Sequence, residues 1–137
     1  MKDMPIGRLV SLIHRQNQKL LSKELKKYEL GNGGQHAFLK KIILQPGINQ
    51  DELSSVLKFD KATTARAMKQ LEKVGYIEKR TDEKDRRANN LYPTEKALKI
   101  YPEIQRVLEG LNKEITRHLT DAEEAILIEL LKKLYIE

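Results

Sequence analysis

A mainly α fold with a single two-stranded β element is predicted by three features of this 137-residue sequence. Apolar residues recur at helical spacing over most of the chain. Only residues 76–92 hold short strand-like runs on both sides of a charged turn. Glycine and proline divide the helical stretches into units of ordinary length. The predicted order is a long helix, three short helices, a hairpin, a long helix and a terminal helix, in one compact domain overall.

The first helix is predicted over residues 5–28. Pro5 suits its first turn, and the glycine-rich segment 31–34 is expected to end it. Its apolar residues lie close to a single helical stripe: Ile6, Leu9, Val10, Ile13, Leu20, Leu21 and Leu25.

The next two helices are short. One is predicted over residues 35–45, with Pro46 and Gly47 at its end. The other begins at Asn49, which lies three residues before Glu52 and so resembles the first member of a capping box.

The fourth predicted helix has Asp60 as its N-cap and runs to about Val74, where Gly75 closes it. Its buried stripe is expected to be Thr64, Ala67, Met68 and Leu71. Placing residues at 100° intervals puts six others on the opposite face, which has three cations and no carboxylate: Ala62, Thr63, Arg66, Lys69, Gln70 and Lys73.

A hairpin is predicted directly after this helix. Residues 76–80 and 88–92 are its strands, and the charged segment 81–87 is its turn. Pro93 is expected to stop the second strand because proline has no N–H to donate.

Two helices are predicted in the C-terminal third. The first covers about residues 94–118, with Gly110 as a candidate bend, and a capping box over residues 120–123 begins the second. The terminal helix has an apolar stripe at i, i+3, i+4 and i+7: Leu127, Leu130, Leu131 and Leu134. Because the first and last helices are too apolar for extensions of a monomer, they indicate a homodimer. The alternative is a terminal helix folded back on its own domain.

A short helix, a tight turn, a helix and a charged ribbon follow one another in the order of a winged helix-turn-helix. We therefore predict a winged helix-turn-helix with N- and C-terminal dimerisation helices. Its parts are an N-terminal dimerisation helix (residues 1–32), the DNA-binding region (33–93) and C-terminal dimerisation helices (94–137).

Positive charge is densest in the predicted DNA-binding region. The chain has 26 basic and 20 acidic residues, and its net charge is +6. Residues 58–87 carry ten basic and six acidic side chains, whereas residues 88–137 carry seven and nine. An ordinary solvated surface explains charge alone equally well, so the pattern needs the support of position.

Position gives the basic residues a role. Small side chains at Ala62 and Thr63 would let the fourth helix approach base edges, and Arg66 could donate two hydrogen bonds to guanine. Lys69 and Lys73 are better suited to phosphates. The predicted DNA-binding residues are Lys61, Ala62, Thr63, Arg66, Lys69, Gln70, Lys73, Lys79, Arg80, Lys84, Arg86 and Arg87.

The last five of these residues surround the turn of the hairpin, here called the wing. An arginine at its tip would suit a narrow minor groove, and the sequence leaves open whether this is Arg86 or Arg87. Asp82 and Asp85 are expected to brace the turn through hydrogen bonds to nearby N–H groups. A charged tip alone usually serves only solubility, and its place after a basic helix is what suggests a function.

At these residues the sequence resembles the MarR family of transcription regulators, over nearly the whole chain. The segments that carry the likeness are residues 35–53, 60–66 and 71–77, followed by Arg80, Asp82 and residues 85–88. Two positions depart from the family pattern. Pro93 opens a segment that usually reads Leu-Thr-x-x-Gly, and Thr64 stands where the family usually has an aliphatic residue.

The resemblance implies a homodimer that is clasped by its terminal helices and binds a pseudo-palindromic operator in double-stranded DNA. Such proteins mostly repress transcription, and many release DNA when a small molecule binds between the dimer helices and the DNA-binding lobe. Five residues could wall such a cleft, although plain core is the simpler explanation of each: Ile13, Leu20, Phe38, Ile42 and Tyr101.

Metal and redox sensing are disfavoured. The chain has no cysteine, which excludes thiol chemistry. Its three histidines, His14, His36 and His118, fall on different predicted helices and lack metal-ligand spacing. His36 near Glu24 or Glu29 would be at most part of a site, so no metal or cofactor is expected.

Other classes of function have little support. We find no nucleophile motif, phosphate-binding loop or paired carboxylates, and therefore do not expect an enzyme. The chain lacks an apolar run of membrane-spanning length, and residues 1–5 do not resemble a signal peptide, so a cytoplasmic protein without a membrane partner is expected. The alternative is a helical protein-interaction or RNA-binding winged-helix module, although the narrow major groove of RNA duplexes would not admit a recognition helix.

Overall fold

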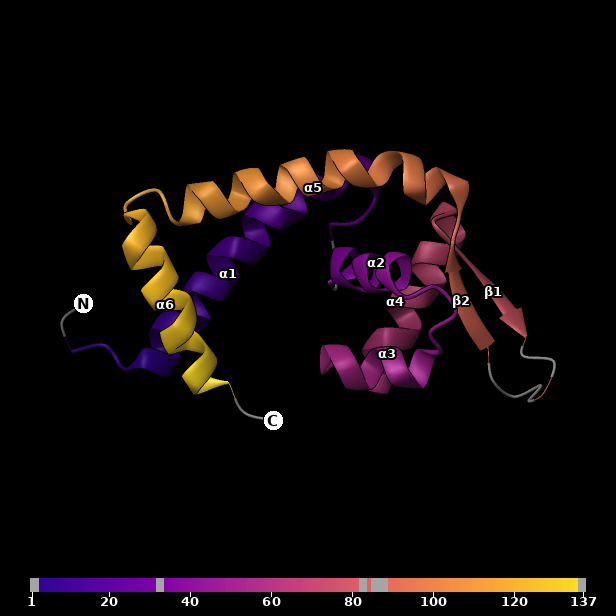
Figure 1. Ribbon diagram of the computed structural model, residues 1–137, viewed down its shortest axis with the longest axis horizontal. Helices are drawn as coiled ribbons and strands as arrows, with labels where there is room; N and C mark the ends of the chain where they lie inside the picture. The colour runs from indigo at the N-terminus through magenta and orange to yellow at the C-terminus, as the bar shows by residue number, and fades with distance from the viewer. Residues whose placement is uncertain (1–2, 32–33, 82–83, 85–88, 136–137) are drawn as a thin grey trace.

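The computed structural model describes residues 3–31, 34–81, 84 and 89–135. Within these residues it confirms the predicted mainly α fold with one two-stranded antiparallel sheet (Figure 1). None of the described helices is long and apolar enough to cross a membrane. The elements are α1 (Ile6–Leu25), the 3-10 helix η1 (Lys26–Tyr28), α2 (Gln35–Leu44), α3 (Gln50–Leu57), α4 (Lys61–Val74), β1 (Ile77–Thr81), β2 (Asn89–Pro93), α5 (Glu95–Ile115) and α6 (Asp121–Leu134).

The elements gather at two ends of an elongated molecule. Figure 1 shows α2, α3, α4 and the sheet together at one end, and α6 with the N-terminal half of α1 at the other. Helix α5 joins the two ends and packs against α1. The core lies mainly in the first lobe, where fully buried residues come from each helix and from β2, among them Phe38, Leu53, Met68 and Leu91.

Helical residues of the first segment continue to Tyr28, as predicted, but the last three form a 3-10 helix. This 3-10 turn follows Leu25, and Glu29 then adopts a left-handed conformation with φ of 61°. The segment 31–34 is therefore not what ends this helix, contrary to the prediction. The Glu29 N–H donates to the Lys26 carbonyl at 2.9 Å and the Leu30 N–H to the Leu25 carbonyl at 3.2 Å, so local backbone hydrogen bonds close the helix before the glycines are reached.

Three helix starts were tested by the structure. Asn49 caps α3 by accepting the Glu52 N–H at 2.8 Å, but the Glu52 carboxylate accepts from the Asn49 side chain instead of its backbone. The predicted capping box is thus incomplete there. In α6 the box is complete between Thr120 and Glu123. Asp60 caps α4 as predicted.

Both strands of the hairpin are five residues long, as predicted, but each is shifted by one residue toward the C-terminus. Pro93 belongs to β2 and pairs with Ile77, and the ladder continues because the Thr94 N–H donates to the Tyr76 carbonyl at 3.0 Å. β2 thus includes Pro93 and ends there, so the predicted strand end is off by one residue only. On the other edge of β2, the Gly47 N–H donates to the Leu91 carbonyl at 2.8 Å, and Asn49 forms an isolated antiparallel bridge with Asn90. Sequence reasoning missed this pairing.

Helix α5 ends at Ile115, three residues before its predicted end, and Gly110 lies within continuous helix. The sequence reading overlooked Pro102 inside it. A proline within a helix removes one backbone hydrogen bond, and Figure 1 shows α5 as a shallow arc. This arc carries the chain from the wing to α6.

Candidate nucleic-acid interface

Helix α4 presents the two faces that its periodicity predicts. Thr64, Ala67, Met68 and Leu71 are all buried, which confirms the predicted stripe. On the other side five of the predicted residues are exposed: Lys61, Ala62, Arg66, Lys69 and Lys73. The structure thus brings four cations of one helix to solvent.

A hydrogen-bonded chain of three side chains orders the first turn of α4. Asp60 accepts the Thr63 N–H at 2.6 Å with Oδ1 and the Thr63 hydroxyl at 2.9 Å with Oδ2. Arg66 Nη2 in turn donates to Thr63 Oγ1 at 3.2 Å. The hydrogen bonds from Thr63, and secondarily the charge of Arg66, lower the pKa of Asp60 below its ordinary value. Asp60 therefore stays ionised at neutral pH.

The contact between α3 and α4 contains a buried hydroxyl pair. Ser54 Oγ donates to Thr64 Oγ1 at 2.8 Å, and Thr64 Oγ1 donates to the Asp60 carbonyl at 2.9 Å. Because the hydroxyl is fully satisfied, Thr64 is accommodated at a position where an aliphatic residue would be usual.

The end of α4 is fixed by residues that sequence reasoning did not single out. Gly75 takes the left-handed conformation with φ of 89° and closes the helix as predicted. Lys96 donates to the Val74 carbonyl at 2.6 Å, and Thr94 donates to the Gly75 carbonyl, also at 2.6 Å. A cation at the carboxyl end of a helix is favourable, and Lys96 therefore locks α4 to the start of α5.

Gln70 differs from the rest of the predicted face. It is only partly exposed and lines a shallow hollow between α4 and the ends of α1 and α2. The other residues around this hollow are Ser22, Lys26, Glu29, Gly31 and Gln35. The cations of α4 thus face solvent, whereas Gln70 faces the hollow toward α1 and α2.

The wing carries only part of the predicted set within the described residues. Arg80 lies over the Tyr92 ring, 4.1 Å from guanidinium carbon to ring centroid, and its Nη2 is 2.5 Å from Glu78 Oε1. Lys79 is partly exposed and Lys84 exposed. Asp82, Asp85, Arg86 and Arg87 lie outside the described residues.

A second candidate region is a hollow between α1, α2 and α5. Burial, and then the nearby charge of Lys40, lower the pKa of His36 beside it. The predicted cleft is not formed by its five residues, since Phe38 and Ile42 are fully buried core and Ile13 is exposed. The hollow is lined instead by Asn17, Leu21, His36, Leu108, Leu111, Asn112 and Ile115.

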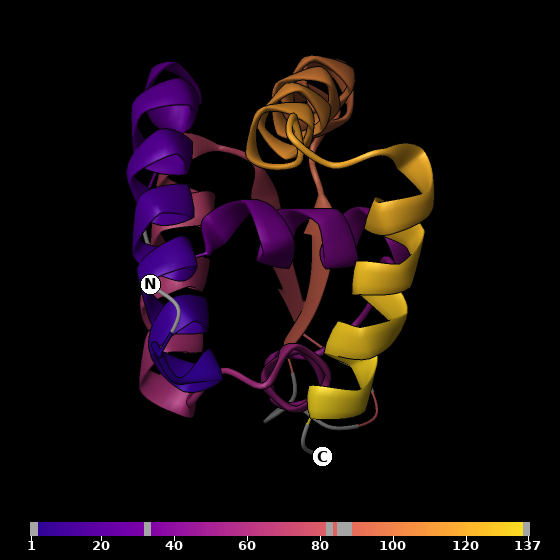
Figure 2. The ribbon, with the colours of Figure 1, turned by 90° about the vertical axis from the view of Figure 1, so that its left-hand side faces the viewer.

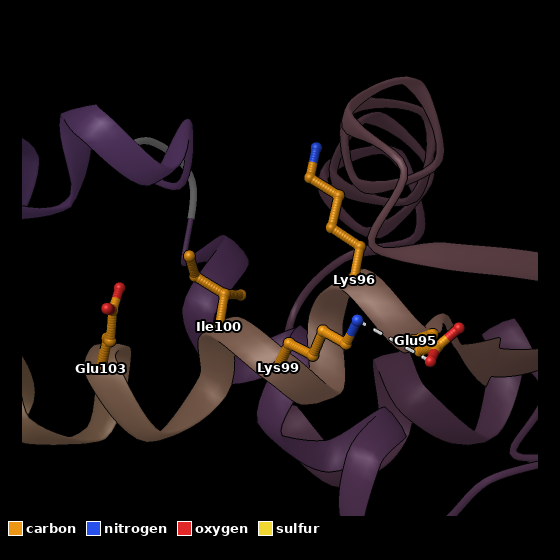
Figure 3. A pocket seen from close by; sticks show the side chains of 5 residues that line it. All are labelled: Glu95, Lys96, Lys99, Ile100 and Glu103. Atoms are coloured by element: carbon orange, nitrogen blue, oxygen red, sulfur yellow. Dashed lines mark ion pairs between the residues drawn. The ribbon is translucent and has the colours of Figure 1, made fainter.

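Figure 3 shows a third hollow, whose five labelled residues all come from the first turns of α5. Its side chains carry both signs of charge, and Lys99 pairs with Glu95 at 3.9 Å. Because a single helix lines it, this hollow is a shallow surface feature.

The three histidines belong to different elements of the structure. His14 lies on α1, His36 on α2, and His118 in the turn after α5. Over the described part of the chain, no three His, Asp or Glu side chains come together in a way that could hold a metal ion.

The arrangement of α3, α4 and the sheet, with an exposed cationic face on α4, defines a DNA-binding winged helix-turn-helix regulator. A family model described as MarR family matches residues 32–88. The chain is 39% identical to the uncharacterized HTH-type transcriptional regulator YybA of Bacillus subtilis, over 74% of this chain and 67% of the relative. It belongs to the MarR family of transcriptional regulators.

Solved structures agree with this assignment. A MarR protein from Peptoclostridium difficile matches with a TM-score of 0.89 and 37% identity, over 96% of this chain and 86% of that one. A MarR family regulator from Listeria monocytogenes, solved in complex with a 26mer DNA, matches with a TM-score of 0.85 and 35% identity, over 96% and 87%.

Proposed function

We propose that this protein is a transcriptional repressor that binds a pseudo-palindromic operator as a homodimer, with α4 of each subunit in a major groove. The observation that carries the proposal is the face of α4, where exposed cations stand opposite a fully buried stripe. The similar Listeria regulator in complex with DNA supports the same use of the fold.

The residues of this face divide by chemistry. Arg66 reads a base edge, because it is exposed one turn into the helix and guanidinium groups match guanine. Lys61, Lys69 and Lys73 contact phosphates, and Ala62 and Thr63 leave room for close approach. Gln70 is the weakest member of the predicted set, since it faces the hollow toward α1.

In the wing, Lys79, Arg80 and Lys84 contribute to the charge near the DNA backbone. One of Arg86 and Arg87 enters the minor groove in this proposal, with Asp82 and Asp85 bracing the turn. Arg80 plays a more structural part than the sequence suggests, because Glu78 and Tyr92 already hold its guanidinium.

Dimerisation accounts for the exposed apolar residues of the terminal helices. Helix α6 buries no residue in the described chain, so the alternative in which it folds back on its own domain finds no support. Figure 2 shows α1 and α6 on opposite sides of α5. The exposed apolar residues of the two helices, which a second copy would cover, are Ile6, Val10, Leu12, Ile13, Ile126, Leu127, Ile128, Leu130, Leu131 and Leu134.

Release by a small molecule is the regulatory part of the proposal. The hollow beside His36 is lined by residues of α1 and α5, which are proposed to take part in dimerisation, and by His36 of α2 in the DNA-binding lobe. A ligand there would contact both parts, and its differential affinity for two arrangements would shift the DNA-binding equilibrium.

The test of the function is a titration of the protein with three nucleic acids: the duplex upstream of its own gene, a shuffled duplex and an RNA duplex of the first sequence. We expect specific binding of the first and weaker, strongly salt-dependent binding of the second. Preference for the RNA duplex would favour the RNA-binding alternative and overturn the proposal.

The same titration with Arg66→Ala and Lys73→Ala separates the two kinds of contact. Arg66→Ala should cost about 1–3 kcal/mol per half-site and relax the preference at one base position. Lys73→Ala should weaken all duplexes similarly and lower the salt slope by about one.

A further inference from the structure

The three side chains at the start of α4 form a chain with a fixed direction. Thr63 has a single hydroxyl proton, which it donates to Asp60 Oδ2 at 2.9 Å. Asp60 is ionised and only accepts. Toward Arg66 the Thr63 oxygen must therefore accept, and Arg66 Nη2 donates to it at 3.2 Å.

This direction has a consequence for an exposed arginine. A free guanidinium at the end of a long side chain samples many rotamers, and ordering it on a base costs binding free energy. The bond to Thr63 holds Arg66 by Nη2, and Nη1 and Nε keep their protons for a ligand. Part of the ordering cost is then met before DNA arrives.

The anchor of the chain is stiff. Asp60 makes two hydrogen bonds to Thr63, one to its backbone N–H and one to its hydroxyl, so the Thr63 side chain has little freedom to turn. Thr63 is also β-branched, and its χ1 rotamers are few in a helix. Arg66 is thus hydrogen-bonded to Thr63, whose side chain is itself held in place by the cap residue Asp60.

We propose that Asp60 and Thr63 are positioning residues that preorganise the Arg66 guanidinium for reading a base edge, so that they set sequence preference without themselves carrying it. The inference rests on the proposed function of Arg66 and adds to it the source of its specificity.

Three variants of Thr63 and Asp60 separate positioning from helix capping. Thr63→Val keeps the shape and the backbone N–H that Asp60 accepts, but removes the hydroxyl. Thr63→Ser restores the hydroxyl. Asp60→Asn preserves an N-cap acceptor and removes the charge. Helicity and thermal unfolding, followed by circular dichroism, show that each variant folds.

The experiment is a double-mutant cycle of Thr63→Val with Arg66→Ala, read as the ratio of affinities for the upstream duplex and the shuffled duplex at one salt concentration. We expect Thr63→Val to lower this ratio about 3- to 10-fold, Thr63→Ser to keep it near wild type, and Asp60→Asn to lower it in part. In the Arg66→Ala background, Thr63→Val should have no further effect.

Two results would overturn the inference. A ratio unchanged by Thr63→Val would show that the hydroxyl does not position Arg66, and the same loss in both backgrounds would show that Thr63 contacts DNA on its own account. If Arg66→Ala itself left the ratio at wild type, the reading role of Arg66 would fail first and the inference with it, which distinguishes the two failures.

Discussion

Ser54 on α3 and Thr64 on α4 share a 2.8 Å hydrogen bond that joins the two helices of the helix-turn-helix. Both residues are buried. Thr64 also donates to the Asp60 carbonyl, so the pair continues into the cap of α4. The angle between the two helices therefore depends on a polar contact that apolar packing alone would not specify.

Thr64→Val should reveal the cost of leaving the Ser54 hydroxyl without its partner. We expect a loss of about 1–3 kcal/mol in the free energy of unfolding, because a buried polar group then stays unpaired. Urea denaturation measures it as a lower midpoint at an unchanged slope.

Ser54→Ala is the matched control, since Thr64 keeps its bond to the Asp60 carbonyl and should lose only about 0.5–1.5 kcal/mol. The double variant should lose less unfolding free energy than the two single variants together, because it leaves neither hydroxyl buried without its partner. Strict additivity would contradict the coupling described here.

Glu78→Gln should strengthen DNA binding by the wing. The Glu78 carboxylate pairs with Arg80 and adds negative charge beside the proposed phosphate contacts. Without it, affinity for specific and shuffled duplexes alike should rise about 2- to 5-fold at low salt, with a salt slope steeper by up to about one. Fluorescence anisotropy at several salt concentrations measures both quantities.

Glu103→Gln on α5 removes the same charge far from the sheet and serves as the control. If Glu78→Gln gave the same affinities and slope as Glu103→Gln, the wing would not contribute to DNA binding through Arg80.

The parts of the structure that could be predicted are those that depend on neighbours along the chain. Periodicity identified the buried stripe of α4, and local hydrogen bonding identified Asp60, Thr120 and Gly75 as caps. These signals act within one or two helical turns, so they are visible in the sequence itself.

The missed features depend on residues far apart in the chain. The Tyr76 hydroxyl donates to the Tyr28 carbonyl at 2.8 Å, which fixes the end of α1 and η1 from the far side of the helix-turn-helix. The Lys96 side chain likewise donates to the Val74 carbonyl, although the whole wing separates these two residues in the sequence. Neither contact leaves a mark on local propensity, because each depends on the finished fold.

The stability of the fold should depend on His36. Burial and the charge of Lys40 lower its pKa below the ordinary value near 6.5, so the folded state favours neutral imidazole. The unfolded chain then binds more protons between the two pKa values. Stability is complete above the ordinary pKa and falls as the pH drops through this window.

Urea denaturation at pH 7.5 and 5.5 tests this expectation. His36→Gln should flatten the loss of stability between the two conditions, whereas His14→Gln, on the exposed part of α1, should leave it as in the wild type. An equal loss of unfolding free energy between the two pH values in all three proteins would show that His36 does not contribute to this loss.

Leu131→Glu should test the proposed dimer most directly. Leu131 lies in the exposed apolar face of α6, and a charge there would be buried without a partner in an interface between copies. Light scattering should show the wild type at about 32 kDa, twice 15.9 kDa, and the variant shifted to the monomer. Because a dimer engages two half-sites at once, the monomer should bind the operator about 10²- to 10⁴-fold more weakly.

Lys133→Glu places the same charge at a polar position of α6 and should remain dimeric. A wild-type protein that is a soluble monomer with full operator affinity would refute the proposed assembly.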